Sequence, residues 1–263
     1  MKRLFLAILL LLALVGHANG QRVLIAYFDN LPERNDVISK LQSTGLISGA
    51  IDSFNIGTST PTLGQLVNYD SVFVFNCCNP INNATAFGNN LADYVDSGGG
   101  VVLAEFGLGA GGGPEGRWLT GGYHPFIKGD SGFVPAFDSI GTRHIPSHPT
   151  LNGVATFSMG NWTGSHNTRT LAPGAIDIAD WTSGFPLVAE DPGHVGRIVG
   201  LNMYPPSNSL DPRFWNTSTN GARLMANAVD YVARVPEPAT VWIAISAASA
   251  ACFARQRRNP TRR

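Results

Sequence analysis

The amino-acid sequence predicts an α/β protein with a doubly wound, mainly parallel sheet. Short apolar runs, typical of strands buried on both faces, alternate with helical patterns through the first half of the chain. Such β-α units in succession favour a parallel sheet with right-handed crossovers. Both ends of the chain differ in composition from this centre, so one domain is expected over residues 21–234.

The first half of this domain is expected to contain apolar strands separated by helices. The strands are expected at Val23–Phe28, Ala50–Ile56, Ser71–Phe75 and Val101–Glu105. The helices are expected at Asp36–Leu46, Leu63–Val67 and Ala84–Asp96. Asn35 and Asn83 are the expected caps of the first and third helices, Pro61 opens the second, and the glycines 98–100 end the third.

The second half is less regular. Residues 107–149 have no convincing periodicity and are expected to form loops with short strands. Three segments then alternate like a meander: Ala175–Asp180, Pro186–Glu190 and Val195–Asn202. A last helix is expected over residues 220–233, with one apolar face formed by Leu224, Met225, Ala228, Val229 and Val232.

Several short motifs lie beside the expected strands and helices. They are Tyr69-Asp70-Ser71-Val72, Tyr94-Val95 with Gly98-Gly99-Gly100-Val101-Val102, His148-Pro149 with Gly153-Val154, Gly196-Arg197-Ile198-Val199 and Asn227-Ala228-Val229. Together they resemble the flavodoxin-like, class I glutamine amidotransferase-like fold, in particular its non-amidotransferase branch of trehalose-utilisation-type proteins. In catalytic members of that fold, the nucleophilic cysteine follows the strand that here ends at Glu105. This chain reads Ala104-Glu105-Phe106-Gly107 there, so we do not expect glutamine hydrolysis.

The carboxyl ends of parallel strands form the ligand-binding edge of such a sheet. We therefore expect a small molecule or glycan to bind near Asp29, Asn76, Cys77 and Glu105. The protein is expected to be non-catalytic, with weak catalytic candidates in Glu105, Cys77 and His148. A structural role for Glu105 is favoured because an isolated acid lacks a paired base.

Alternatives to simple binding remain. Cys77 and Cys78 are expected to form a vicinal disulfide or packed thiols rather than a nucleophile paired with a histidine. A rival hypothesis is an exported hydrolase of carbohydrate or amide bonds, with Glu105 or Asp29 as base. A third is a structural component of the extracellular matrix.

Two roles are open for the tryptophans Trp118, Trp162, Trp181 and Trp215. They either pack in the core, which is the commoner fate of tryptophan, or line a carbohydrate platform.

No cofactor and no metal are predicted. The glycine pattern of residues 107–112 follows the wrong strand for a dinucleotide loop and is better explained as a flexible surface loop. His144 and His148 have i, i+4 spacing, but Pro146 and Pro149 disfavour the helix that would place both on one face. Zinc is therefore not expected.

The amino-terminal end, residues 1–20, is typical of a cleavable signal peptide. Lys2 and Arg3 precede an uncharged apolar run from Leu4 to Val15, and small residues at Ala18 and Gly20 suit a signal peptidase. About twelve apolar residues are too few to span a membrane. The mature chain is expected to begin at Gln21.

Residues 235–263 resemble a sorting tail. Pro236-Glu237-Pro238 precedes an apolar, alanine-rich stretch over 239–254, which is the expected transmembrane helix, and residues 255–263 are rich in arginine, typical of the cytoplasmic side. This order of motif, apolar span and basic end resembles the PEP-CTERM sorting signal. The resemblance implies export, a temporary inner-membrane anchor, processing by an exosortase, and a final place at the cell surface or in an extracellular polysaccharide matrix.

Charge argues against nucleic acid as a partner. The whole chain has 18 basic and 18 acidic residues, but two basic residues precede Gln21 and five follow residue 254. The remaining part therefore has a net charge of about −7, which repels polyanions.

Overall fold

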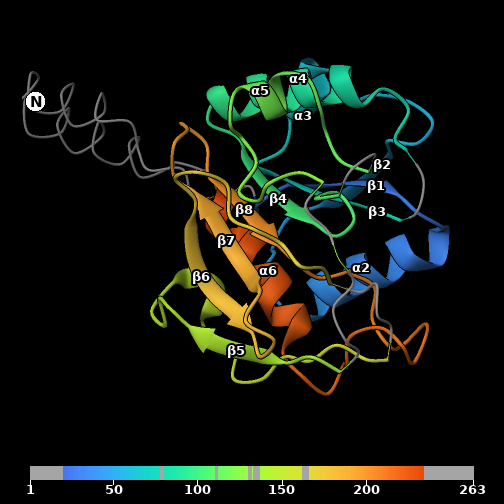
Figure 1. Ribbon diagram of the computed structural model, residues 1–263. Coiled ribbons are helices and arrows are strands. Elements are labelled where there is room, and N and C mark those ends of the chain that lie inside the picture. The colour runs from blue at the N-terminus through green and yellow to red at the C-terminus, as the bar shows by residue number, and fades with distance from the viewer. Residues whose placement is uncertain are drawn as a thin grey trace, which may run out of the picture.

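The computed structural model describes residues 20–77, 80–109, 112–129, 132, 137–161 and 166–233, which form three layers with a mixed sheet between two layers of helices (Figure 1). The strands are β1 Val23–Phe28, β2 Ile51–Asn55, β3 Ser71–Asn76, β4 Gly100–Ala104, β5 Ile140–Arg143, β6 Ile176–Trp181, β7 Pro186–Asp191 and β8 Ile198–Leu201. The helices are α2 Leu31–Ser43, α3 Leu63–Leu66, α4 Ala84–Asp96, α5 Arg117–Thr120 and α6 Gly221–Ala233, with a 3₁₀ turn at Pro149–Leu151.

The sheet has eight strands in the order β2-β1-β3-β4-β8-β7-β6-β5. The first five strands of this order are parallel to one another, and β8, β7, β6 and β5 form an antiparallel meander. The α/β fold with a mostly parallel sheet is therefore confirmed, and the predicted meander is its antiparallel half.

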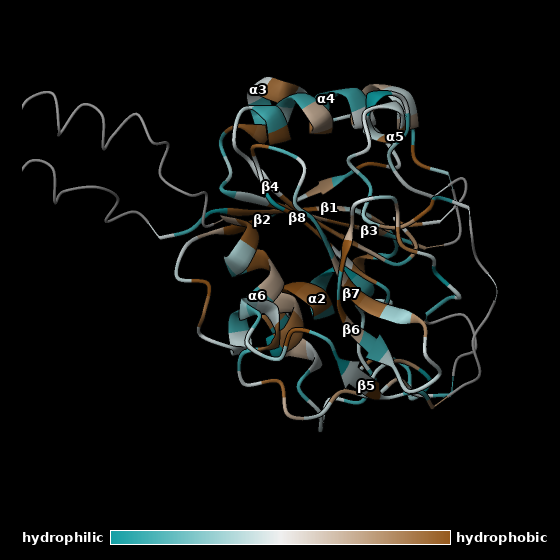
Figure 2. Ribbon diagram, turned by 60° about the vertical axis from the view of Figure 1, so that its left-hand side comes forward, coloured by the Kyte–Doolittle hydropathy of each residue, from teal (hydrophilic) through white to brown (hydrophobic). Residues whose placement is uncertain are grey.

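Helices cover both faces of the parallel half, as expected for a doubly wound sheet. In Figure 1, α3, α4 and α5 lie on one side of the sheet, and α2 and α6 lie on the other. Every residue of β3 and β4 is buried, because each strand has helices over both faces. In Figure 2 the strands of the parallel half are mostly brown where they lie between the two helical layers. Two apolar clusters result, one on each face of the sheet.

Helix boundaries follow local capping chemistry. Helix α4 begins after Asn83, whose side chain accepts the Ala86 N–H at 2.9 Å, as predicted. Helix α3 begins with a capping box between Thr62 and Gln65. The predicted start of α2 after Asn35 is wrong, because that helix begins at Leu31 with Pro32 in its first turn, where proline is well tolerated.

The described part of the glycine-rich loop is buried, not exposed as a surface loop would be. Residues 107–109 and 112–114 are all buried in the fold. A Cβ added to Gly113 would lie 1.8 Å from the carbonyl oxygen of Gly107. Glycine is therefore needed here for close backbone packing, which the sequence pattern does not distinguish from flexibility.

Both ends of the domain lie at the amino edge of the parallel strands. Gln21 Nε2 donates to the Val229 carbonyl oxygen near the end of α6, at 3.1 Å. The Cβ position of Gly100, at the start of β4, is 2.4 Å from the carbonyl oxygen of Val232. The chain therefore enters and leaves the domain at the edge opposite the carboxyl ends of β1, β3 and β4.

The predicted signal peptide, apart from Gly20, and the predicted tail from residue 235 onward lie outside the described residues. Among the residues that the structure describes, no helix combines the length and apolar composition needed to cross a membrane.

Candidate functional site

The predicted ligand-binding residues come together at the carboxyl edge of the sheet. Backbone hydrogen bonds continue across this edge beyond the strands: Cys77 N–H donates to the Phe28 carbonyl at 2.9 Å, and Phe106 N–H donates to the Asn76 carbonyl at 2.9 Å. Asp29 follows Phe28 directly, and Glu105 precedes Phe106. These contacts place Asp29, Asn76, Cys77 and Glu105 on neighbouring segments of one edge.

Asp29 is the partly accessible carboxylate of this edge. Burial raises its pKa above the ordinary value, although hydrogen bonds from Tyr204 and from the Asn30 N–H act in the opposite direction. The Tyr204 hydroxyl donates to Asp29 Oδ2. Burial and the neighbouring Asp29 charge raise the pKa of Tyr204, so this phenol stays protonated and remains a donor.

Two aromatic rings stand beside this acid. The Phe106 and Tyr204 rings have centroids 5.8 Å apart, and the Tyr204 ring packs edge-on against Phe214 at 5.0 Å. The segment after β8 therefore provides Tyr204, the hydrogen-bond partner of Asp29. The segment after β4 provides the Phe106 ring, which packs against Tyr204. Rings of this kind can cover the apolar face of a sugar.

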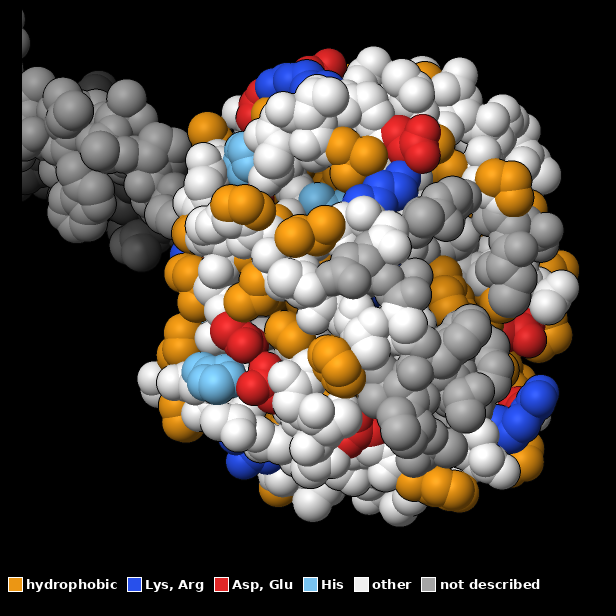
Figure 3. Space-filling model, viewed as in Figure 1, with side chains coloured by type: hydrophobic (Ala, Val, Ile, Leu, Met, Phe, Trp, Pro, Cys, Tyr) orange, Lys and Arg blue, Asp and Glu red, His pale blue; other side chains and the backbone are white. Residues whose placement is uncertain are grey.

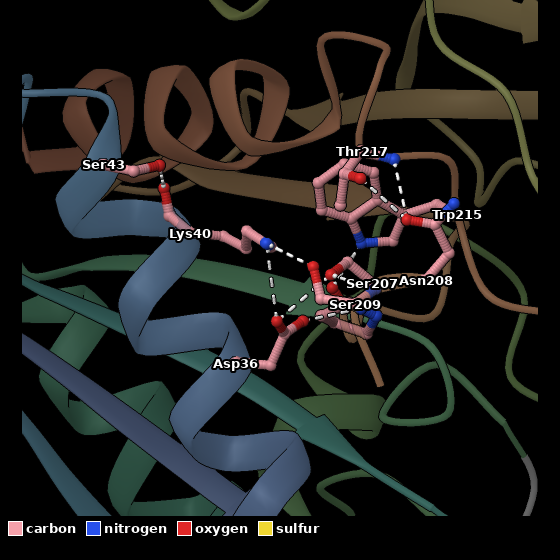
Figure 4. A network of polar contacts seen from close by, with 9 residues as sticks. Asp36, Lys40, Ser43, Ser207, Asn208, Ser209, Trp215 and Thr217 are labelled. Atoms are coloured by element: carbon pink, nitrogen blue, oxygen red, sulfur yellow. Dashed lines mark hydrogen bonds and ion pairs between the residues drawn. The ribbon is translucent and has the colours of Figure 1, made fainter. Parts of the chain in front are cut away.

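A polar network ties the segment after β8 to helix α2 and so fixes the position of Tyr204. Asp36 accepts the Ser207 N–H at 2.7 Å and its hydroxyl at 3.1 Å, and Lys40 Nζ donates to Ser209 Oγ at 2.7 Å (Figure 4). Lys40 also lies 3.7 Å from Asp36. Figure 4 shows the Trp215 indole on the same segment, where its N–H donates to the Pro205 carbonyl.

Glu105 forms a fully buried ion pair with Arg169. The Arg169 Nε and Nη2 atoms each lie 2.7 Å from one carboxylate oxygen of Glu105, and both side chains have no exposed surface. A bidentate guanidinium occupies both oxygens of the acid. In this arrangement Glu105 positions Arg169, and its carboxylate has no exposed surface at which it could act as a general base on a substrate.

Polar residues behind this pair complete the buried part of the site. His166 Nε2 lies 3.1 Å from Asp138 Oδ2, and Thr182 and Ser183 donate their hydroxyls to the same carboxylate. Burial lowers the pKa of His166 below its ordinary value even though Asp138 favours the charged ring. His124 is also buried, and burial, followed by the positive charges of Arg169 and Lys128, lowers its pKa to about 3.

The remaining catalytic candidates lie in unreactive surroundings. Cys77 is disulfide-bonded, so it offers no free thiol. A vicinal pairing stays a prediction, because Cys78 lies outside the described residues. His148 is buried elsewhere, with Nε2 3.2 Å from Glu190 and Nδ1 2.8 Å from Thr150 Oγ1. None of its partners is a predicted site residue.

The described tryptophans do not form a carbohydrate platform. Trp118, Trp181 and Trp215 are buried in the core, and Trp162 lies outside the described residues. Two concavities lined by described residues, of 450 and 360 Å³, lie beside β5 and at the amino edge, and neither is lined by the predicted site residues.

Sequence reasoning missed Tyr204 and Arg169. Tyr204 follows the strand predicted over 195–202, so the rule that identified Asp29 and Asn76 applied to it as well. Arg169 lies in an irregular segment 64 residues from Glu105 in sequence, and no local pattern indicates their contact.

The elements and their order define an α/β fold with a mostly parallel, mixed sheet of eight strands. Among solved structures, it is similar to a ThuA-like protein from Bacteroides uniformis, with a TM-score of 0.52, 15% identity, and coverage of 79% of this chain and 89% of that one. A ThuA-like protein from Parabacteroides merdae gives a TM-score of 0.55 and 12% identity over 82% and 92% of the two chains. Comparison with family models and with curated proteins gives no match. The ThuA-like fold is thereby established, and at this identity the similarity extends to the fold alone.

Proposed function

We propose that this is an exported surface or extracellular-matrix protein, sorted by an exosortase, whose α/β domain binds a small molecule or glycan at the carboxyl edge of its sheet. One observation carries the proposal: polar residues after neighbouring parallel strands meet at one edge, while both ends of the domain leave from the opposite edge. A domain held by its tail would therefore present this edge away from the membrane.

The chemistry of the edge suits a ligand rich in hydroxyl groups. The carboxylate of Asp29 accepts hydrogen bonds from hydroxyls, and an amide such as that of Asn76 both donates and accepts. The ring of Phe106 supplies a partly exposed apolar surface next to these groups. Small polar and aromatic groups that converge in this way give orientation and specificity to a bound small molecule.

Binding is favoured over nucleophilic catalysis. The position after β4 carries Glu105 instead of a cysteine, and Arg169 occupies both of its oxygens. Cys77 has no free thiol. A hydrolase is the second candidate, with Asp29 as its catalytic acid or base. The pKa of Asp29 is raised, as it is in many catalytic acids.

The binding test uses the purified full-length chain on a glycan array, followed by titration calorimetry with the glycan that binds best. Asp29→Asn should weaken binding about tenfold to a hundredfold, because a hydrogen bond to a charged acceptor contributes about 1.5–3 kcal/mol. Asp52→Asn is the matched control, since Asp52 lies near the start of β2 and pairs with the exposed Arg22 at the amino edge of the sheet.

Each outcome separates the hypotheses. Equal binding by wild type and Asp29→Asn would exclude this edge as the binding site. Turnover of the bound glycan that Asp29→Asn abolishes would identify a hydrolase instead. The absence of saturable binding to any small molecule or glycan would favour a structural matrix component.

A further inference from the structure

A second cluster of ligand-type side chains lies apart from the carboxyl edge, over β5 and β6. His144 follows β5, and Asp177 and Asp180 belong to β6. His144 Nε2 lies 2.8 Å from Asp180 Oδ2 and 3.5 Å from Asp177 Oδ2, and one donor atom of each residue lies within 4.8 Å of the others. Figure 3 shows a histidine side chain against acidic side chains on this part of the surface.

An irregularity in β6 brings the two carboxylates together. Residues three apart in a regular strand point to opposite faces of the sheet. The register between β6 and β7 shifts on both sides of Ala179, however, so Asp177 and Asp180 lie on the same face. Ile178 and Trp181 pack instead in the apolar core. Such bulges commonly re-aim side chains next to functional sites.

Among the described residues, neither carboxylate pairs with a lysine or an arginine. Within the described part of the chain, the ion pairs of Asp177 and Asp180 are made with His144 alone. The Oδ1 atoms of both aspartates are buried, and no described residue donates a hydrogen bond to them. Two partly desolvated carboxylates side by side repel each other, and a bound cation removes this repulsion.

The distances suit a small divalent metal. Metal–nitrogen and metal–oxygen bonds of about 2.1 Å in a tetrahedral arrangement separate neighbouring ligand atoms by about 3.4 Å. The His144–Asp177 distance of 3.5 Å already matches this value, and the His144–Asp180 contact would open by about 0.6 Å. The His144 side chain is 41% exposed, so solvent can reach a fourth position.

We propose that His144, Asp177 and Asp180 bind one divalent transition metal of the zinc class, with water as the fourth ligand. An imidazole ligand favours zinc and its neighbours over magnesium and calcium, which take oxygen ligands. Pro146 and Pro149 disfavour only a helical pairing of His144 with His148. In the structure His144 pairs with the carboxylates of β6 instead.

The test is titration calorimetry with zinc chloride on the full-length chain, produced without a histidine tag and stripped with EDTA. One ion should bind per chain. His144→Ala and Asp180→Asn should each weaken binding by about a hundredfold or more, since even the loss of a residue that only orients a ligand costs about tenfold to a hundredfold. His194→Ala is the matched control, because His194 lies 3.5 Å from a single aspartate, Asp191.

Cobalt provides a second readout, because tetrahedral Co²⁺ with these ligands should give visible absorption that both variants lose. Circular dichroism verifies that each variant is folded. Failure of zinc to bind, unchanged binding in both variants, or tighter binding of calcium or magnesium chloride than of zinc would overturn the proposal.

Discussion

At the level of single residues, Glu105 and Arg169 depend on each other, because they form a bidentate ion pair inside the core. Glu105→Gln should leave Arg169 buried without its counter-charge and lower the free energy of unfolding by about 3–5 kcal/mol. Urea unfolding of the full-length chain, followed by circular dichroism, measures this change.

The double variant Glu105→Gln with Arg169→Met is the control for that prediction. It should cost less than the sum of the single changes, because it leaves no unpaired buried charge. Strict additivity, or a Glu105→Gln variant as stable as the wild type, would show that the pair does not act as one unit.

His124 should make the protein sensitive to mild acid. Burial holds its pKa at about 3 in the folded chain, whereas a histidine in the unfolded chain has a pKa of about 6.5. Its contribution to stability is therefore complete above pH 6.5 and is lost as the pH falls toward 3. Between pH 6.5 and 5 the loss should be about 2 kcal/mol.

Urea unfolding at pH 7 and at pH 5 tests this dependence in wild type and in His124→Phe. The substitution should flatten the pH dependence, because it removes the buried imidazole whose pKa is lowered. An equally steep loss of stability in His124→Phe would contradict the assignment. The lowered pKa of His166 acts in the same direction, so part of the slope should remain.

How far sequence predicts single residues depends on whether a local rule applies to them. Asp29, Asn76, Cys77 and Glu105 were predicted to share an edge because each ends or follows a recognisable buried strand. The partner of Glu105 was not predictable, since Arg169 comes from an irregular segment and the contact depends on tertiary packing. The His144 cluster was missed because a bulge, invisible in the alternation of β6, brings Asp177 and Asp180 to one face.

At the level of elements, helix α4 packs unusually close to the segment before α5. A Cβ on Gly88 would lie 1.8 Å from the carbonyl oxygen of Glu115. Gly88→Ala should therefore separate the two backbones and lower stability by about 1–3 kcal/mol, as overpacking does elsewhere. The melting temperature of the full-length chain reports this loss.

Gly64→Ala is the matched control within helix α3, where the nearest atom to an added Cβ is Thr62 Oγ1 at 4.0 Å. Removing a helical glycine without a clash should raise stability by about 0.5–1 kcal/mol. Opposite signs for the two substitutions are expected. A fall in melting temperature at Gly64, or none at Gly88, would contradict the packing argument.

Elements with strong local signals were predictable in place and type. Helix α4 has both its cap and its glycine stop in the sequence, and α6 has a single apolar face that the structure buries. The short elements β5 and α5 lie in the region expected to form loops with short strands, where no periodicity locates them. Four-residue elements depend on their neighbours for stability and leave little trace in sequence.

For the whole molecule, the sheet order determines what the two ends of the domain can do. Sequence predicted the parallel units and the meander, but not that β8 pairs with β4 and so joins the two halves into one sheet. This pairing brings Tyr204 beside Asp29, and α6 returns the chain to the amino edge next to Gln21. A tail attached after α6 would therefore leave the carboxyl edge of the sheet unobstructed.

Export and tail processing are the central claim, and mass spectrometry of the mature protein combined with cell fractionation tests them most directly. The chain should begin at Gln21, end within the region of Pro236-Glu237-Pro238, and be found at the cell surface or in the matrix. A variant truncated after Arg234 should be exported but lost from the surface fraction. An intact chain of 263 residues in the cytoplasm would contradict the account.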